Sequence, residues 1–316
     1  MNDYVCIIGG INIDIKGIAG SDSTIADSHP GKIIINPGGV ARNISENLAC
    51  LDVPSALMGC VGDDYYGNLI INETNRRGVN TDYVIKSSSV PTAKYLSVSA
   101  GDGELSYAVN DMKDSLSLIT PDFIEANRNV LERSSFIAID TNLSKEVLEN
   151  ILSIANISDI PVYLDTVSSE KAMVVRELTG RINYLSPNLQ EYESIFGMYN
   201  DGVEMLEYLC EGVFKNYNYV IVKKGEAGVD MISIEDGKIF TEGSIKQDVV
   251  EPNGAGDAFN AGFIYALTKK KNCKEAVRFG ICAAHFALSS VKTVSGDLTV
   301  KKLNTLYKKY YSENAL

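Results

Sequence analysis

Short apolar runs alternate with segments of helical periodicity along most of this chain, and this alternation constrains the fold more than any other feature. The expected strands are 4–8, 56–61, 136–140, 162–165, 184–186, 220–223 and 229–234. The expected helices of the regular part, from residue 121 onward, are 145–155, 170–178, 189–196, 202–215, 257–269, 274–290 and 301–311. Strands that alternate with helices predict βαβ units, so we expect a mainly parallel sheet covered by helices on both faces.

Two β-rich stretches interrupt this rhythm in the N-terminal half. Residues 16–36 lack helical periodicity and end in an alternating apolar run. Residues 93–109 read as two strands joined by a hairpin turn at Gly101-Asp-Gly103. We interpret both stretches as a small sheet, built from about residues 15–36 and 92–112, that stands off a single main domain spanning residues 1–316.

Charge and composition exclude several classes of partner. The chain has 29 basic and 41 acidic residues, and its formal net charge is −12. This charge argues against a nucleic acid or an anionic membrane surface as the main partner. No apolar run is long enough to span a bilayer. Six scattered cysteines without a Cys-x-x-Cys pair, and an N-terminus without a signal-like segment, predict free thiols in a reducing cytosol.

The stretch 251–263 joins a loop of small residues to a helix. Gly254, Ala255 and Gly256 carry almost no side-chain bulk, and the helical pattern begins at Asp257. Free backbone N–H groups and the helix dipole attract an anion to such a place. A carboxylate beside an anion hole suits phosphoryl transfer, because it accepts a proton from the attacking hydroxyl. Alternatively, the glycines form a turn and Asp257 caps the helix.

A second helix start follows the strand at 184–186. Asn188 and Glu191 lie three residues apart on its first turn, so their oxygens would face the same way. Amide and carboxylate oxygens suit Mg²⁺, which usually keeps several of its waters. Alternatively, Asn188 is the N-cap and Glu191 its third-position partner in a capping box.

Two lysines and two glycines follow the strand at 220–223. Gly225 and Gly228 permit a tight turn over a nucleotide, and Lys223 or Lys224 would meet a phosphate. Alternatively, this segment is a hairpin with solvated lysines.

Polar residues and glycines near the N-terminus form a candidate ligand pocket. Asn12 and Asp14 follow the end of the first strand, where open α/β sheets bind ligands, although they would also suit a turn. Gly38 and Gly39 would let the backbone approach a ligand closely, and Asn43 would hydrogen-bond a sugar hydroxyl. The alternative is an ordinary helix N-terminus with glycines at its start.

Other common catalytic motifs are absent from the sequence. It lacks the Gly-x-x-x-x-Gly-Lys-Ser/Thr of a P-loop, and it has two histidines, His29 and His285. Because His285 lies in the apolar helix 280–290, we expect it to be packed rather than catalytic. No metal cluster or Ser-His-Asp hydrolase site has its parts in the sequence.

Taken in order, four of these stretches resemble the signatures of the ribokinase-like family of carbohydrate kinases, also called the PfkB type. The stretches are 38–43, 188–191, 224–228 and 254–257. The likeness covers nearly the whole chain, and it implies an α/β/α sandwich with a small β-sheet lid. It also implies that MgATP phosphorylates a sugar-like alcohol, with Asp257 as the base and residues 254–256 as the anion hole. The sugar would then be held by Asn12, Asp14, Gly38, Gly39 and Asn43, and the nucleotide by Asn188, Lys223, Lys224, Gly225, Gly228, Gly254 and Gly256.

Within this family, the stretches 28–33, 109–112 and 165–171 look like those of kinases that act on pseudouridine. They cover both lid segments and one wall of the site, where Asn110 and Lys171 would read a nucleobase. The likeness implies phosphorylation of the 5′-hydroxyl of pseudouridine. A ribokinase, or a kinase of another nucleoside or sugar, is the alternative enzyme. An inactive sugar sensor on the same fold is a further alternative, against which Asp257 and the intact Gly-Ala-Gly argue.

Two departures and one consequence of the lid complete these expectations. The family's usual Asp-Thr-Thr before Gly-Ala-Gly is Glu-Pro-Asn at 251–253, which argues against a monovalent-cation site like that of ribokinase. Thr166 stands where the pseudouridine kinases have proline.

The exposed edge of so small a sheet needs to be covered. We therefore expect a homodimer in which the lid of a second subunit covers this edge.

Overall fold

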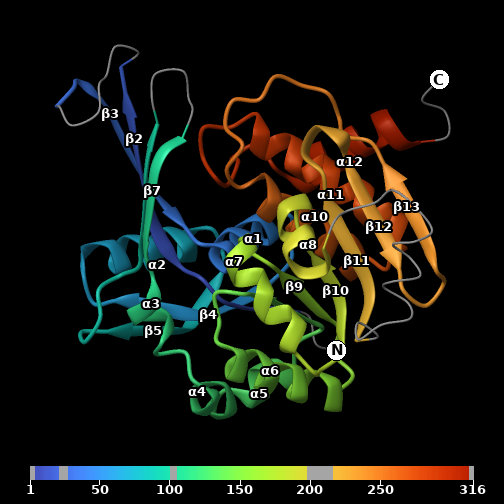
Figure 1. Cartoon of the computed structure of the whole chain (residues 1–316), viewed down its shortest axis with the longest axis horizontal. Coiled ribbons are helices and arrows are strands. Elements are labelled where there is room, and N and C mark those ends of the chain that lie inside the picture. The colour runs from blue at the N-terminus through green and yellow to red at the C-terminus, as the bar shows by residue number, and fades with distance from the viewer. Residues whose placement is uncertain (1–3, 21–27, 100–104, 198–215, 313–316) are drawn as a thin grey trace.

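The computed structural model describes residues 4–20, 28–99, 105–197 and 216–312, which form two sheets (Figure 1). The larger sheet has nine strands in the order β13-β12-β11-β10-β9-β8-β1-β4-β5. These strands are β1 (Val5–Ile8), β4 (Ser55–Gly62), β5 (Asn80–Ser87), β8 (Phe136–Asp140), β9 (Val162–Asp165), β10 (Ile182–Ser186), β11 (Tyr217–Lys223), β12 (Val229–Ser233) and β13 (Lys238–Glu242).

Helices cover both faces of this sheet. The strands from β5 to β11 pair in parallel, whereas β12 and β13 add an antiparallel edge. Side chains alternate along β1, so Val5 and Ile7 enter one apolar core while Cys6 and Ile8 enter the other. The first core is closed by α1 (Val40–Cys50), α2 (Tyr65–Arg76), α10 (Ala255–Thr268), α11 (Cys273–Leu288) and α12 (Val300–Tyr311). The second core is closed by α4 (Pro121–Ala126), α5 (Arg128–Glu132), α6 (Lys145–Ile157) and α8 (Leu189–Phe196). The predicted α/β/α sandwich is confirmed.

The smaller sheet stands away from the main body (Figure 1). Its four strands, in the order β3-β2-β6-β7, are β2 (Asn12–Ala19), β3 (Gly31–Gly38), β6 (Lys94–Ser99) and β7 (Leu105–Asp111). The two β-rich stretches of the sequence join through parallel pairing of β2 with β6. Asn12 and Asp14 follow the end of β1, as expected, but they lie inside β2, so the alternative that they form a turn is wrong. The chain passes from β1 through Gly9 and Gly10 directly into the second sheet.

Most predicted helices occur, with shifted ends. The helix Leu189–Phe196 is confirmed, whereas α10 begins at Ala255 because Gly254, rather than Asp257, is its N-cap. The segment 170–178 splits into α7 (Ser169–Ala172) and a 3₁₀ turn, η1 (Met173–Glu177). The helix expected at 202–215 and the turn at 101–103 lie outside the described residues. The apolar pattern does not predict the edge strands β5 and β13, or the short helix α3 (Lys113–Leu116), because all three carry many polar side chains.

No helix in the described ranges is long and apolar enough to cross a membrane. The thiols of Cys6, Cys50, Cys60, Cys273 and Cys282 are free, while Cys210 lies outside the described residues.

Candidate active site

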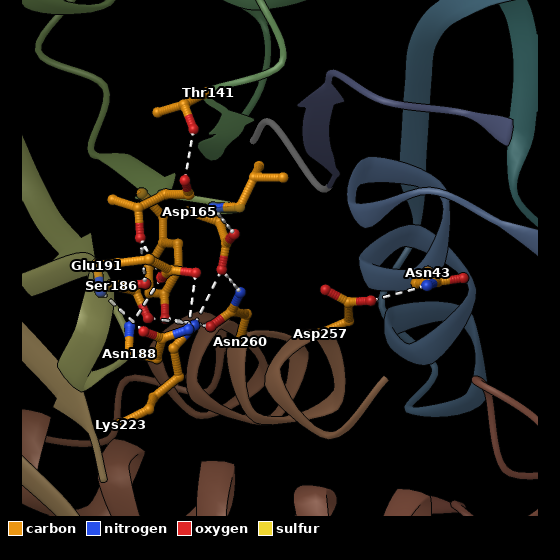
Figure 2. A network of polar contacts seen from close by, with 12 residues as sticks. Asn43, Thr141, Asp165, Ser186, Asn188, Glu191, Lys223, Asp257 and Asn260 are labelled. Carbon is orange, nitrogen blue, oxygen red and sulfur yellow. Dashed lines mark hydrogen bonds and ion pairs between the residues drawn. The ribbon is translucent and has the colours of Figure 1, made fainter. Parts of the chain in front are cut away.

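Polar side chains gather at the carboxyl edge of the parallel strands (Figure 2). Asp140, Asp165 and Ser186 end β8, β9 and β10, and the strand register places them side by side. Lys223 ends β11 and pairs with Asn188, which follows β10. Ligands of open α/β sheets bind at this edge, so it is the candidate active site.

The glycine loop and Asp257 form the first part of the site. Gly254 has a φ of 86°, and a Cβ there would lie 2.3 Å from the carbonyl oxygen of Thr293, so only glycine fits. Asp257 follows in the first turn of α10, and its Oδ2 accepts a 2.7 Å hydrogen bond from Asn43 Nδ2 (Figure 2). Asn43 belongs to α1, so the fold brings two stretches together that lie far apart in the sequence.

The surroundings of Asp257 favour its protonated form. Burial, the carboxylate of Asp165 and, more weakly, that of Asp14 raise the pKa of Asp257 to about 8, although Asn43 and Lys223 act in the opposite direction. The residue remains partly exposed, so the surrounding protein desolvates the carboxyl without closing it off from a substrate. A carboxyl with a pKa near neutrality is suited to accept a proton.

The predicted sugar-binding residues lie where the second sheet meets α1. Asn12 Nδ2 donates a 2.7 Å hydrogen bond to Asp14 Oδ1, and burial raises the pKa of Asp14. A Cβ on Gly38 would lie 2.2 Å from Asp14 Oδ2, and one on Gly39, whose φ is 100°, would lie 2.3 Å from the carbonyl oxygen of Gly10. The two glycines are therefore required by the packing of the chain itself, whatever ligand they admit.

The alternative considered for Asn188 and Glu191, a capping box, is present. Glu191 N donates to Asn188 Oδ1 at 2.9 Å, and Asn188 N donates to Glu191 Oε2 at 2.8 Å. Glu191 Oε2 also accepts a 2.6 Å hydrogen bond from Thr166 Oγ1. Burial and the charge of Asp165 raise the pKa of Glu191. A cation beside the Glu191 carboxylate would stabilise its ionised form and so counter the effects of burial and of Asp165 on its pKa.

Lys223 and Lys224 point to different places. Lys223 Nζ lies 3.0 Å from Asp165 Oδ2 and 3.7 Å from the Cβ position of Gly256, so its ammonium group lies beside the glycine loop. Lys224 Nζ pairs with Asp230 on β12 at 2.7 Å. The structure therefore brings Lys223 to the site and directs Lys224 away from it.

A cavity of about 780 Å³ adjoins the glycine loop. Gly225 and Gly228 have φ values of 58° and 92°, which allow the tight turn that borders the cavity. His285, which the sequence suggests is packed, lines the wall, and burial lowers its pKa. The other lining residues include Lys223, Ile245, Ala255, Gly256, Phe259 and Ile281. The size of the cavity suits a nucleotide.

Asn110 and Lys171 lie on different elements of the fold. Asn110 is exposed on β7, and the register Asp14–Tyr95–Asn110 places these three residues on one face of the second sheet. Lys171 Nζ donates to Asn142 Oδ1 at the carboxyl end of β8. Asp140, at the same place, has its pKa raised to about 6 by burial.

Sequence analysis gave Asp165 no role of its own within the stretch 165–171, and it missed Asn260. Asp165 is buried and accepts hydrogen bonds from Asn260 Nδ2 at 2.7 Å and from Lys223. A carboxylate that ends a buried strand is the signal that would have found it, because strand ends point to the binding edge. In the sequence, Asn260 is one more position of an apolar helix, and nothing in the pattern of that helix marks it as a site residue.

Comparisons with known proteins agree with this geometry. The model of the pfkB family of carbohydrate kinases matches residues 2–299. The chain belongs to this family. It is 35% identical to the pseudouridine kinase of Escherichia coli strain K12, over 96% of each chain. It is 24% identical to the guanosine-inosine kinase of Exiguobacterium acetylicum, over 91% of this chain and 95% of that one.

Solved structures give the same fold. The ribokinase of Arabidopsis thaliana, solved with ribose and ATP, superposes with a TM-score of 0.79 at 21% identity, over 98% of this chain and 99% of its own. The chain is therefore a ribokinase-like kinase, a phosphotransferase that acts on a hydroxyl group of a small sugar or nucleoside.

Proposed function

We propose that this kinase transfers the terminal phosphoryl group of ATP to the 5′-hydroxyl of pseudouridine. The similarity to the Escherichia coli pseudouridine kinase over nearly the full length of both chains carries this proposal. The pseudouridine kinase of Arabidopsis thaliana, 24% identical over 58% of this chain, supports it.

In this proposal Asp257 is the general base. Its carboxylate takes the proton of the 5′-hydroxyl as the oxygen attacks the phosphorus, and the bond to the leaving ADP oxygen breaks. The backbone N–H groups of residues 254–256 and the N-terminus of α10 stabilise charge on the transferred group. Asn43 orients the base through its 2.7 Å hydrogen bond, and Lys223 adds a positive charge beside the loop.

We also propose that Asn188 and Glu191 hold a hydrated Mg²⁺ ion. Burial and, after it, the carboxylate of Asp165 raise the pKa of Glu191, and a cation nearby would offset both causes. The side-chain oxygens of Asn188 and Glu191 are ligands that suit a hard divalent cation. Such an ion supplies charge neutralisation for the phosphates of ATP. The capping box would keep these side chains in place while waters link them to the ion.

For the acceptor, we propose that Asn12, Asp14, Gly38, Gly39 and Asn43 hold the ribose. The second sheet would act as a lid that excludes water from the reaction. Asn110 shares a sheet face with Asp14, and Lys171 lies beside Asn142 near the carboxyl end of β8. In this proposal, closure of the lid would let the two side chains read the base between them.

A comparison of pseudouridine with uridine tests the substrate. Pseudouridine carries a ring N–H that uridine lacks, and an acceptor that lid closure buries and leaves unpaired would make the site reject uridine. We expect much faster phosphorylation of pseudouridine at equal concentration, and Asn110→Ala to narrow the gap. Asp111→Ala is the matched control, because Asp111 alternates to the other face of β7. Equal rates on both nucleosides would refute the substrate, and efficient turnover of ribose alone would favour a ribokinase.

We further propose a homodimer that joins the outer faces of two lids. Six exposed apolar side chains share this face, in two rows across the strands: Ile33, Ile35, Leu96, Val98, Tyr107 and Val109. A monomer rarely exposes so much contiguous apolar surface, and a two-fold axis would let the patch cover itself. Sedimentation should give a dimer for the wild type and a monomer for Leu96→Asp, whereas Met173→Asp, at an exposed site elsewhere, should stay dimeric. A monomeric wild type would refute the interface.

A further inference from the structure

A buried polar network joins β9, β10 and β11 to α10 (Figure 2). Its centre is Asn260, which is fully buried on α10, one turn after Asp257. Asn260 Oδ1 accepts hydrogen bonds from Tyr163 Oη at 2.7 Å and Ser186 Oγ at 3.1 Å. These two donors leave its amide nitrogen to face Asp165, to which it donates at 2.7 Å. The network therefore fixes the rotation of α10 against β9 and β10.

Asp165 connects this network to Lys223. Its Oδ2 accepts from both Asn260 Nδ2 and Lys223 Nζ, the latter at 3.0 Å. Its Oδ1 accepts from Val167 N at 2.9 Å. Val167 has a φ of 59°, which a β-branched residue rarely adopts, and such strain concentrates at functional sites. Asp165 is thus held from three directions.

Lys223 connects this network to the N-terminus of α10. Its ammonium group lies against the first turn of α10, 3.7 Å from the Cβ position of Gly256. Neutralisation of a buried carboxylate needs a cation, but it does not need that cation at the N-terminus of a helix, where an anion would bind. A positive charge and the backbone N–H groups at the start of α10 therefore converge on the same place.

We propose that Asp165 and Asn260 are positioning residues for phosphoryl transfer, which act by holding the Lys223 ammonium group beside the loop 254–256. This proposal rests on the proposed role of that loop in binding the transferred phosphoryl group. Asn260 sets the direction of the Asp165 carboxylate, and Asp165 sets the place of the ammonium group. Catalysis then needs no rearrangement of Lys223 when charge develops.

A double-mutant cycle between Asp165→Asn and Lys223→Met tests the proposal. At a pH above the pKa of Asp257, where this base is ionised in every variant, we expect each single variant to lower kcat about 10- to 100-fold, as loss of a charge-assisted contact predicts, with the KM for pseudouridine nearly unchanged. Because Asp165 acts through Lys223, the double variant should be no slower than Lys223→Met within about twofold. Losses that multiply would overturn the proposal. If Asp165→Asn does not fold, Asn260→Leu replaces it in the cycle.

A structural role alone would give a different pattern. Thr141→Val is the matched control, because it removes a buried 2.7 Å hydrogen bond to the Thr166 carbonyl at the same strand edge without touching Lys223. It should lower the melting temperature with little loss of kcat. An equal loss of kcat in this control would also overturn the proposal.

The pH profile gives a second readout. Asp257 is faced by Asp165 from β9, Lys223 from β11, Asn43 from α1 and Asp14 from β2. The rate should fall on the acid side of the pH profile as Asp257 becomes protonated. Removal of the Asp165 charge should move the midpoint of this fall to lower pH, and Thr141→Val should leave the midpoint in place. If the wild type phosphorylates ribose rather than pseudouridine, the proposed substrate fails, yet the same cycle with ribose still decides the roles of Asp165 and Asn260. Calorimetric titration measures the affinity of the same four proteins for MgATP, so this version of the cycle needs no acceptor.

Discussion

Asp257 makes the rate depend on pH in a direction that its surroundings determine. A general base works in its ionised form, and burial together with Asp165 raises the pKa of this carboxyl to about 8. The rate should therefore fall as the pH drops through this value, at a pH where an ordinary aspartate would stay ionised.

The size of the effect follows from the ionised fraction. A pKa of about 8 leaves roughly 1% of Asp257 ionised at pH 6, roughly 10% at pH 7 and roughly 90% at pH 9. We therefore expect kcat/KM to rise about 90-fold from pH 6 to pH 9, with the steepest fractional rise below pH 8. A bound divalent cation would lower the pKa, so the free enzyme gives the highest midpoint.

The assay is ADP release with pseudouridine and MgATP, both well below their KM values, where the rate reports the free enzyme. Asp257→Asn is the control, because an amide cannot ionise and keeps the shape of the carboxyl. Its rate should fall about 10²- to 10⁴-fold and lose the acid limb. A wild-type profile that is flat from pH 6 to 9, or an Asp257→Asn variant that keeps the limb, would refute the assignment.

Stability should respond in the opposite sense. The folded chain holds a proton on Asp257 up to about pH 8, whereas the unfolded chain loses it near 3.8. The folded state thus binds more protons between these values, so its stability falls as the pH rises through this window. Asp257→Asn should flatten this part of the urea-unfolding profile.

Three further predictions concern the loop, the cation and the second sheet. Glu191→Gln should raise the Mg²⁺ concentration that gives the half-maximal rate, whereas an unchanged Mg²⁺ requirement with a lower melting temperature would leave only the capping role. Gly254→Ala should cost at least about 1–3 kcal/mol in urea unfolding and most of the activity, since φ is 86° and the new Cβ would meet a carbonyl oxygen; Gly296→Ala, with open space around it, should cost little. Lys16→Met breaks the ion pair between β2 and Glu251. Because this pair is partly exposed, it contributes little, so we expect only a few-fold rise in the KM for the nucleoside. The melting temperature should stay within about 2 °C of wild type.

Local features of this protein were predictable from the sequence because their causes are local. The helix Leu189–Phe196, with its capping box, depends on residues three apart, and the glycine loop before α10 depends on a steric rule for one backbone position. The alternation of strand and helix was enough to predict a parallel sheet with two covered faces. The glycine loop at 254–256 and the pair Asn188 and Glu191 became candidates because each stretch marks a helix start in the sequence.

Other features needed the tertiary structure. Asn43 and Asp257 are 214 residues apart, and their hydrogen bond depends on how α1 packs against α10. The choice of Lys223 over Lys224 for the site depends on where each side chain points: Lys223, the last residue of β11, reaches Asp165 and the loop before α10, whereas Lys224 pairs with Asp230 on β12. Asp165 and Asn260 meet only because parallel strand order brings β9 beneath α10. These contacts depend on sheet order and register, which are properties of the whole core, so no short stretch of sequence determines them.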